Sequence, residues 1–369
     1  MIEGRELSDK KFQIDSLDGL RGLAVLLVIL SHTSGGKSFL FPHMDFSGAG
    51  KNGVFLFFVL SSFLLTLPFI KKQGEAKSFN FLLNYFSRRF FRIYPLYFIY
   101  LLLALATSKL AAIVHYGESK GIPFYLTFKD FIEHLFLIQG KEVTWSIVVE
   151  FHYYFVLPFV ALAYSVVFKN KLIPSILFTL GLIVLSQVFW PQHDAVPNDL
   201  RLGPYLLIFF MGSLLALLFH KWQEHPLSKN NKVILAIEIT GILALLVLIF
   251  LIPSVSSFFL EKKIPFNQYH EEFIIFGLLW SIVLFSSITT RGVIRRFFEY
   301  PFLRYLGFIS FSAYLLHEIA MSLISKVGVN HLMQGWFTLA LTILLSHISW
   351  TLIEKPAAKI KIAFNLKRN

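Results

Sequence analysis

The sequence contains no cysteine and little charge. Without cysteine, the chain has no disulfide, no thiol nucleophile and no thiolate ligand for a metal. Charged residues make up 15% of the 369 residues, whereas they make up about 25% of a typical soluble protein. Hydrophobic residues make up 56%, and the mean hydropathy is +0.65. The composition therefore predicts a protein that crosses a membrane several times.

Long apolar runs give the number of expected spans, because a helix needs about 20 residues to cross the hydrocarbon core of a bilayer. Ten such runs occur, at 17–33, 53–70, 93–113, 145–167, 172–190, 202–219, 233–252, 272–290, 305–325 and 334–353. We therefore expect an all-α integral membrane protein. Its ten-helix domain covers residues 17–353, between a cytoplasmic segment at 1–16 and a basic cytoplasmic tail at 354–369.

The distribution of lysine and arginine predicts the orientation in the membrane. If the N-terminus is cytoplasmic, the cytoplasmic segments hold 23 of these residues and the outer loops hold 9. Cytoplasmic loops of membrane proteins carry such an excess. Both termini should therefore be cytoplasmic, as an even number of spans requires. The net charge of +12 follows this topology and is not gathered in one patch, so we expect no nucleic-acid partner.

The first span carries ionisable residues, which are costly inside a membrane and therefore favour a functional site. Arg21 and His32 lie eleven residues apart, so both side chains share one helix face, about 16 Å apart along the axis. Asp18 lies three residues before Arg21 and can pair with it. In the alternative interpretation, His32 is an interfacial histidine, and Asp18 and Arg21 anchor the helix at the headgroups.

Three arginines, Arg88, Arg89 and Arg92, stand at the start of the third span. Arg88 and Arg92 are four residues apart and should face the same way on a helix. Guanidinium groups bind phosphate oxygens through paired hydrogen bonds. The cluster is therefore a candidate site for a phosphate-bearing ligand, with ordinary anchoring by positive residues as the alternative.

The fourth span begins with the motif WSIVVEFHYYFVLP. Ser146, Glu150 and Tyr154 recur every four residues in it and so share one face. In the predicted orientation, Glu150 lies at a depth similar to that of His32. A carboxylate near a histidine can orient the ring or stabilise its charged form during proton transfer. A structural polar contact between helices is the alternative.

A second intramembrane histidine, His317, stands beside Glu318 in the ninth span. We expect His317 to support the site and not to act as its primary base. The histidines of the chain lack the paired spacing of a zinc site, so we expect no metal.

Six motifs occur in a fixed order along the chain. They are LDGLRG with Arg21 and, after ten residues, His32; GVFLFFVLS; the arginine cluster followed by Pro95; WSIVVEFHYY; GFISFSAYLLH; and IEKP. In this order they resemble the acyltransferase family 3 of multi-spanning membrane O-acyltransferases, over about residues 15–357. One departure is Ser62, where the family pattern LSGF usually has glycine. Serine is also small enough for close helix contact.

The resemblance implies ten helices around a central cavity, surrounded by lipid in the plasma membrane of a bacterium. It implies an acyl-coenzyme A donor, usually acetyl-coenzyme A, that reaches the site from the cytoplasm. It also implies an acceptor hydroxyl on a surface polysaccharide or lipid-linked glycan at the outer side. On the family pattern, Arg21 and His32 are the essential pair, the arginine cluster recognises the donor, and Glu150 belongs to the active site.

These observations lead to a hypothesis for the reaction. The arginine cluster holds the coenzyme A phosphates. His32, tuned by Glu150, removes the proton from the acceptor hydroxyl as that hydroxyl attacks the thioester. Arg21 holds part of the donor or maintains the helix, and transient acylation of His32 is an open alternative. Two other classes of protein also remain open: a proton-coupled transporter, which needs intramembrane ionisable residues as well, and a glycan-binding protein without catalysis.

Overall fold

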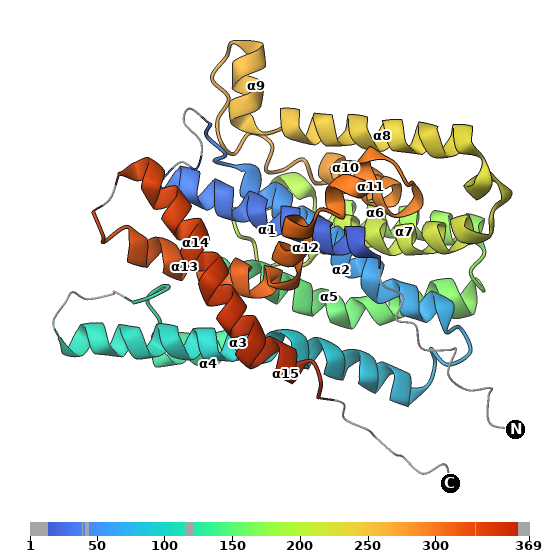
Figure 1. The fold of residues 1–369 in the computed structure, drawn as a ribbon. Coiled ribbons are helices and arrows are strands. Elements are labelled where there is room, and N and C mark those ends of the chain that lie inside the picture. Colours follow the sequence, from blue (N-terminus) through green and yellow to red (C-terminus); the bar gives the residue numbers. More distant parts are fainter. Residues whose placement is uncertain (1–13, 39, 41–43, 115–120, 329, 361–369) are drawn as a thin grey trace, which may run out of the picture.

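The computed structural model describes residues 14–38, 40, 44–114, 121–328 and 330–360, and most of these residues are helical (Figure 1). No strand occurs among them. The helices are α1 (Asp15–Gly35), α2 (Ala49–Lys71), α3 (Phe79–Ile113), α4 (Phe128–Leu135), α5 (Thr144–Leu162), α6 (Leu172–Phe189), α7 (Leu206–Glu224), α8 (Asn231–Phe250), α9 (Pro253–Leu260), α10 (Phe273–Thr289), α11 (Val293–Phe298), α12 (Pro301–Phe308), α13 (Ser310–Ile324), α14 (His331–Ser349) and α15 (Lys355–Ala357).

The helices agree with the predicted spans. In the part of the chain that the structure describes, eight helices are long and apolar enough to cross a membrane, and the bent pair of α12 and α13 makes a ninth. Helix α10, with 17 residues, is a shorter apolar helix at the position of the predicted eighth span. All ten predicted runs therefore coincide with helices, and the predicted all-α membrane fold is confirmed.

Helices α1 and α2 form the centre of the bundle. In their most apolar stretches, 67% and 78% of the residues are buried, whereas 17% are buried in both α6 and α8. Helix α1 packs on α2 and α12, and α2 packs on α7. Figure 1 shows α3 along one edge of the bundle and α8 along the opposite edge. The ionisable residues Asp18, Arg21 and His32 of α1 are half-buried in this bundle, and α6 and α8 offer apolar surface to lipid.

The ninth predicted span, 305–325, is not one straight helix. It breaks at Ile309, and α12 and α13 meet at an angle of 81°. Close packing of α12 on α1 accompanies the break: a Cβ atom at Gly307 would lie 1.9 Å from the carbonyl oxygen of Asp18, so glycine is needed there. The prediction of a continuous span was wrong, because the length of an apolar run carries no information about a bend. The bend turns α13 so that His317 reaches the end of α1.

Side-chain caps fix the starts of several helices. The side chain of Ser78 accepts a hydrogen bond from the Phe81 amide at the start of α3, and that of Asn230 accepts two at the start of α8. Thr127 and Asp130 form a capping box at the start of α4. These side-chain hydrogen bonds define the first residues of α3, α4 and α8.

The predicted terminal segments lie largely outside the described residues. Of the segment 1–16, residues 14–16 are described, and of the tail 354–369, residues 354–360. The start of α1 is tied to α12 by an ion pair in which Asp15 Oδ1 and an Arg304 nitrogen are 2.8 Å apart. The cytoplasmic position of both termini stays a prediction.

Candidate active site

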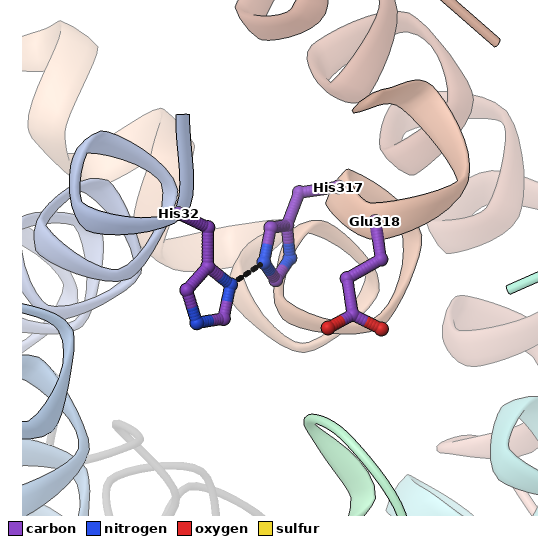
Figure 2. Close-up of side chains that lie close together, drawn as sticks. All are labelled: His32, His317 and Glu318. Atoms are coloured by element: carbon purple, nitrogen blue, oxygen red, sulfur yellow. Dashed lines mark hydrogen bonds between the residues drawn. The ribbon is translucent and has the colours of Figure 1, made fainter. Parts of the chain in front are cut away.

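Two histidines from distant parts of the sequence meet inside the bundle. His32 stands in the last turn of α1, and His317 stands in the middle of α13 (Figure 2). His32 Nδ1 lies 2.6 Å from His317 Nε2, and the stacked rings have centroids 4.9 Å apart. His317 is fully buried and His32 is half-buried. The structure thus gives His32 a direct partner that sequence spacing could not reveal.

The hydrogen bonds of this pair assign the protons on its rings. His317 Nδ1 lies 3.2 Å from the carbonyl oxygen of Ala313, and because a carbonyl only accepts, that nitrogen carries a proton. In neutral His317, Nε2 is then an acceptor, and His32 Nδ1 donates to it. Neutral His32 consequently has a free lone pair on its own Nε2. That nitrogen can take a proton from a ligand.

Glu318 lies beside the two histidines (Figure 2). One potential ligand atom from each of the three residues lies within 4.8 Å of the others, which is close enough for a metal site. However, two nitrogens bound to one zinc ion lie about 3.3 Å apart. The observed 2.6 Å between His32 Nδ1 and His317 Nε2 fits a hydrogen bond instead. We therefore interpret the pair as hydrogen-bonded, and the predicted absence of a metal stays a prediction.

His32 lines a cavity of about 550 Å³, which we call the histidine cavity. Its volume lies in the range of pockets that bind small molecules. Its charged, amide and aromatic lining residues include Lys51, Glu142, Trp145, Asn198, Phe266, Asn267, His270 and Glu318. These side chains combine hydrogen-bonding groups with aromatic faces, which suits a ligand rich in hydroxyl groups.

The loop before α10 forms one wall of the histidine cavity. His270 Nε2 in this loop lies 3.2 Å from the carbonyl oxygen of Gly48. Burial, reinforced by the positive charge of Lys51, lowers the pKa of His270 to about 4. His270 is therefore neutral near pH 7, where its Nε2–H donates to the carbonyl. We interpret it as a structural contact that holds the wall in place.

A second cavity, the arginine cavity, lies among α1, α2, α3, α5 and α13 and is narrow, at about 70 Å³. Arg21, Arg89 and Arg92 line it. Arg88 is exposed and does not line it, although it lies one turn from Arg92 on α3, so two of the three predicted arginines reach this cavity. Arg89 and Arg92, three positions apart on α3, both line the cavity.

Glu150 belongs to the arginine cavity. Its Oε1 accepts hydrogen bonds from Ser61 Oγ at 2.5 Å and from the Tyr154 hydroxyl at 2.6 Å. Ser146, Glu150 and Tyr154 all line this cavity, as their predicted common face requires. The expected contact between Glu150 and His32 is not formed: Glu150 binds Ser61 and Tyr154, and His32 Nδ1 binds His317. Similar depth in the membrane does not bring side chains of different helices together.

The two cavities share a wall. Val54 and Tyr314 line both of them. The Tyr314 hydroxyl lies 2.7 Å from Ser146 Oγ and donates to the carbonyl oxygen of Val143 at 2.9 Å. Tyr314 thus stands, fixed by hydrogen bonds, between the arginines on one side and the histidine pair on the other.

Sequence reasoning missed the roles of three residues in these cavities. Ser61 lies within the motif GVFLFFVLS and Tyr314 within GFISFSAYLLH. Their place in these motifs could have marked both residues as candidates. Lys51 precedes the predicted second span, and the fold alone brings it to the histidine cavity. Asp18 is half-buried on α1, and its predicted pairing with Arg21 stays a prediction.

The chain matches a family model described as an acyltransferase domain over residues 14–353, and it therefore belongs to that acyltransferase family, as its motifs predicted. It is 25% identical over 373 residues to the peptidoglycan O-acetyltransferase OatA of Listeria monocytogenes, a match that covers 94% of this chain and 56% of that protein. It is 24% identical over 368 residues to the O-acetyltransferase OatA of Staphylococcus aureus, a match that covers 94% of this chain and 57% of that protein. The chain thus spans little more than half the length of these relatives. No solved structure matches it.

Proposed function

We propose that this chain is a bacterial membrane O-acetyltransferase. It moves an acetyl group from cytoplasmic acetyl-coenzyme A to a hydroxyl of a cell-envelope glycan, and the names of its relatives make peptidoglycan the first acceptor to test. The observation that carries the proposal is the placement of the His32–His317 pair beside the wall that the two cavities share.

The arginine cavity is the proposed donor side. Arg89 and Arg92 lie in the half of α3 that the lysine and arginine distribution places toward the cytoplasm, and guanidinium groups suit the phosphates of coenzyme A. Arg21 adds a third positive charge. We propose that the thioester arm of the donor enters between these helices, with the phosphate-bearing nucleotide portion beside the arginines at the cytoplasmic end. Tyr314 then stands where the acetyl group meets the acceptor.

The histidine cavity is the proposed acceptor side. His32 Nε2 takes the proton of the acceptor hydroxyl while the hydroxyl oxygen forms a bond to the thioester carbonyl carbon. The carbon–sulfur bond breaks, the thiolate of coenzyme A leaves, and the proton returns from His32 to that sulfur. His317 holds His32 in the tautomer that this step needs. Acylation of His32 before the hydroxyl attacks is the alternative order of events.

Glu150 receives a different role from the one that sequence spacing suggested. Because it binds Ser61 and Tyr154 in the arginine cavity, we propose that it shapes the donor passage. It would also balance the positive charge of the arginines there.

The test is acetyl transfer from labelled acetyl-coenzyme A to peptidoglycan fragments by the purified protein. We expect His32→Ala to lower the rate by about 10²–10⁴-fold, the usual contribution of a general base. His152→Ala is the matched control, because this half-buried histidine of α5 lines neither the histidine cavity nor the arginine cavity.

Equal transfer by wild type and His32→Ala would remove His32 from the chemistry. A second outcome would overturn the proposal altogether: the wild type consumes no donor and instead takes up a solute in a proton-dependent way in vesicles. The chain would then be a proton-coupled transporter.

A further inference from the structure

A third cavity adjoins the site. It has a volume of about 760 Å³, and we call it the side cavity. Two carboxylates, Glu142 before α5 and Glu318 on α13, line both the side cavity and the histidine cavity. Building on the proposed function, we propose that these two cavities form one groove that binds an extended glycan chain, so that the acetylated sugar is an internal one and not a chain end.

The course of α13 connects the two cavities. Glu318, one residue after the histidine of the pair, lines both, and Met321 lines the histidine cavity. Ser322, one turn beyond Glu318 on the same face, lines the side cavity. The opposite wall of the side cavity consists of the end of α3, with Thr107 and Ala111, and the segment 121–125. A ligand lying along α13 therefore passes from one cavity into the other beside His32.

The chemistry of the shared region suits sugars. Carboxyl groups accept hydrogen bonds from hydroxyl groups, and a protonated one also donates. Aromatic side chains lie on both sides, with Trp145 in the histidine cavity and Tyr125 in the side cavity. Such rings present apolar faces to the apolar faces of sugar rings.

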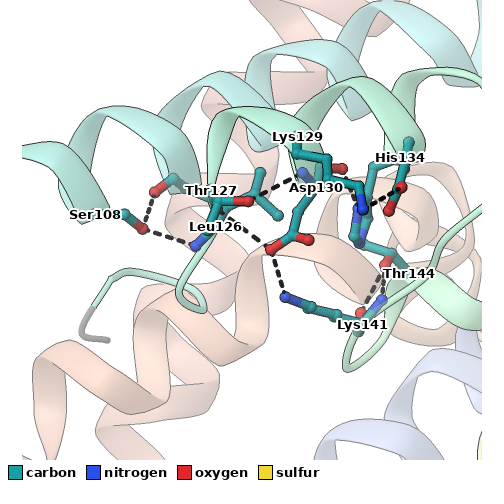
Figure 3. Close-up of polar contacts among 10 residues, drawn as sticks. Ser108, Leu126, Thr127, Lys129, Asp130, His134, Lys141 and Thr144 are labelled. Carbon is teal, nitrogen blue, oxygen red and sulfur yellow. Dashed lines mark hydrogen bonds and ion pairs between the residues drawn. The ribbon is translucent and has the colours of Figure 1, made fainter. Parts of the chain in front are cut away.

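The segment that forms the outer wall of the side cavity is fixed to its surroundings (Figure 3). The Leu126 amide donates to Ser108 Oγ at 2.9 Å, and the Ile122 amide donates to Thr107 Oγ1 at 2.9 Å. Behind them, Lys141 Nζ lies 2.8 Å from Asp130 Oδ2, and this hydrogen bond is the main cause of a lowered pKa at Asp130. The wall is therefore formed before any ligand arrives, which reduces the entropy lost on binding.

Two neighbouring alanines of α3 provide a matched pair of variants. Ala111 lines the side cavity, whereas Ala112 is exposed and does not. The purified full chain is given acetyl-coenzyme A and peptidoglycan glycan fragments of two or eight sugars. The measured quantity is the ratio of kcat/KM for the octasaccharide to kcat/KM for the disaccharide.

We expect the wild type and Ala112→Trp to favour the octasaccharide by about tenfold or more, equivalent to about 1.4 kcal/mol. Ala111→Trp places a large ring in the side cavity, obstructs the path along it and should bring this ratio close to one. Ser322→Trp, which obstructs the same cavity from α13, should have the same effect. The substitution Leu323→Trp at the neighbouring exposed position is its control.

A wild-type ratio near one, or an equal ratio in Ala111→Trp and Ala112→Trp, would overturn the groove and leave the acetyltransferase proposal intact. If the wild type acetylates neither fragment, the proposed function fails for this acceptor, and the groove built on it fails as well.

Discussion

At the scale of single residues, the contact between His32 and His317 decides which nitrogen can act as a base. His317→Leu removes the acceptor for His32 Nδ1–H, and we expect kcat to fall by about 10²-fold, the lower end of what acid–base catalysis contributes. In His317→Gln, the side-chain amide oxygen can take the place of His317 Nε2 as the acceptor, so this variant should retain much of the activity that His317→Leu loses. The measurement is kcat and its pH profile for both variants at equal protein abundance.

A purely structural role for His317 gives a different pattern. Both variants would then lose folded protein in parallel, and the pH profile of the remaining activity would match that of the wild type. This outcome would contradict the assigned tautomers.

The arginines of α3 offer a second residue-scale prediction. Arg89→Ala and Arg92→Ala should each raise KM for acetyl-coenzyme A by about tenfold, the value of one charge-assisted hydrogen bond. Arg88→Ala is the matched control, because this arginine is exposed and outside the arginine cavity. The measurement is KM and kcat for the donor at a fixed acceptor concentration. An equal effect of all three substitutions would indicate membrane anchoring instead of donor binding.

The sequence predicted the residue types of the site better than their partners. Periodicity along one helix placed Ser146, Glu150 and Tyr154 on a common face, and the structure agrees. Contacts between helices depend on crossing angles and bends that one-dimensional spacing does not contain. For this reason Glu150 was expected beside His32, and the hydrogen bond from His32 to His317 was not foreseen.

At the scale of helices, the close approach of α1 and α12 positions the histidine pair. Gly307→Ala places a Cβ atom 1.9 Å from the backbone oxygen of Asp18, which cannot be relieved by a side-chain rotation. We expect a loss of about 1–3 kcal/mol in stability, the usual cost of overpacking. Gly181→Ala in α6 is the control, since no heavy atom lies within 4 Å of its added Cβ.

The measurement for this pair is the thermal midpoint of each purified variant. Gly181→Ala should leave the midpoint equal or slightly raised, because alanine favours a helix over glycine. A Gly307→Ala variant as stable as the wild type would show that α12 can move away from α1 without cost.

The helices themselves were largely predictable, because burial in a membrane requires long apolar runs that stand out from the loops. The bend at Ile309 was not, since an 81° change of direction leaves the run 305–325 apolar throughout. That bend is nevertheless what brings His317 to His32. The approximate positions of the spans were thus available from composition, whereas the start of α3 at Phe79, before the predicted run 93–113, and the site geometry were not.

At the scale of the whole molecule, the orientation in the membrane can be tested directly because the chain has no cysteine. Single cysteines can be introduced at Lys229, in the loop before α8, and at Lys262, in the loop after α9, both exposed. In intact cells, a membrane-impermeant maleimide should label Lys262→Cys and spare Lys229→Cys. The reverse pattern would invert the predicted topology and place the arginine cavity toward the outside.

The central claim is that donor and acceptor reach one site from opposite sides of the membrane. The most direct test uses vesicles of known orientation, loaded with labelled acetyl-coenzyme A on the cytoplasmic side, with impermeant peptidoglycan fragments on the outer side. We predict acetyl transfer to the outer fragments by the wild type and its loss in His32→Ala. Transfer that requires donor and acceptor on the same side would contradict the account.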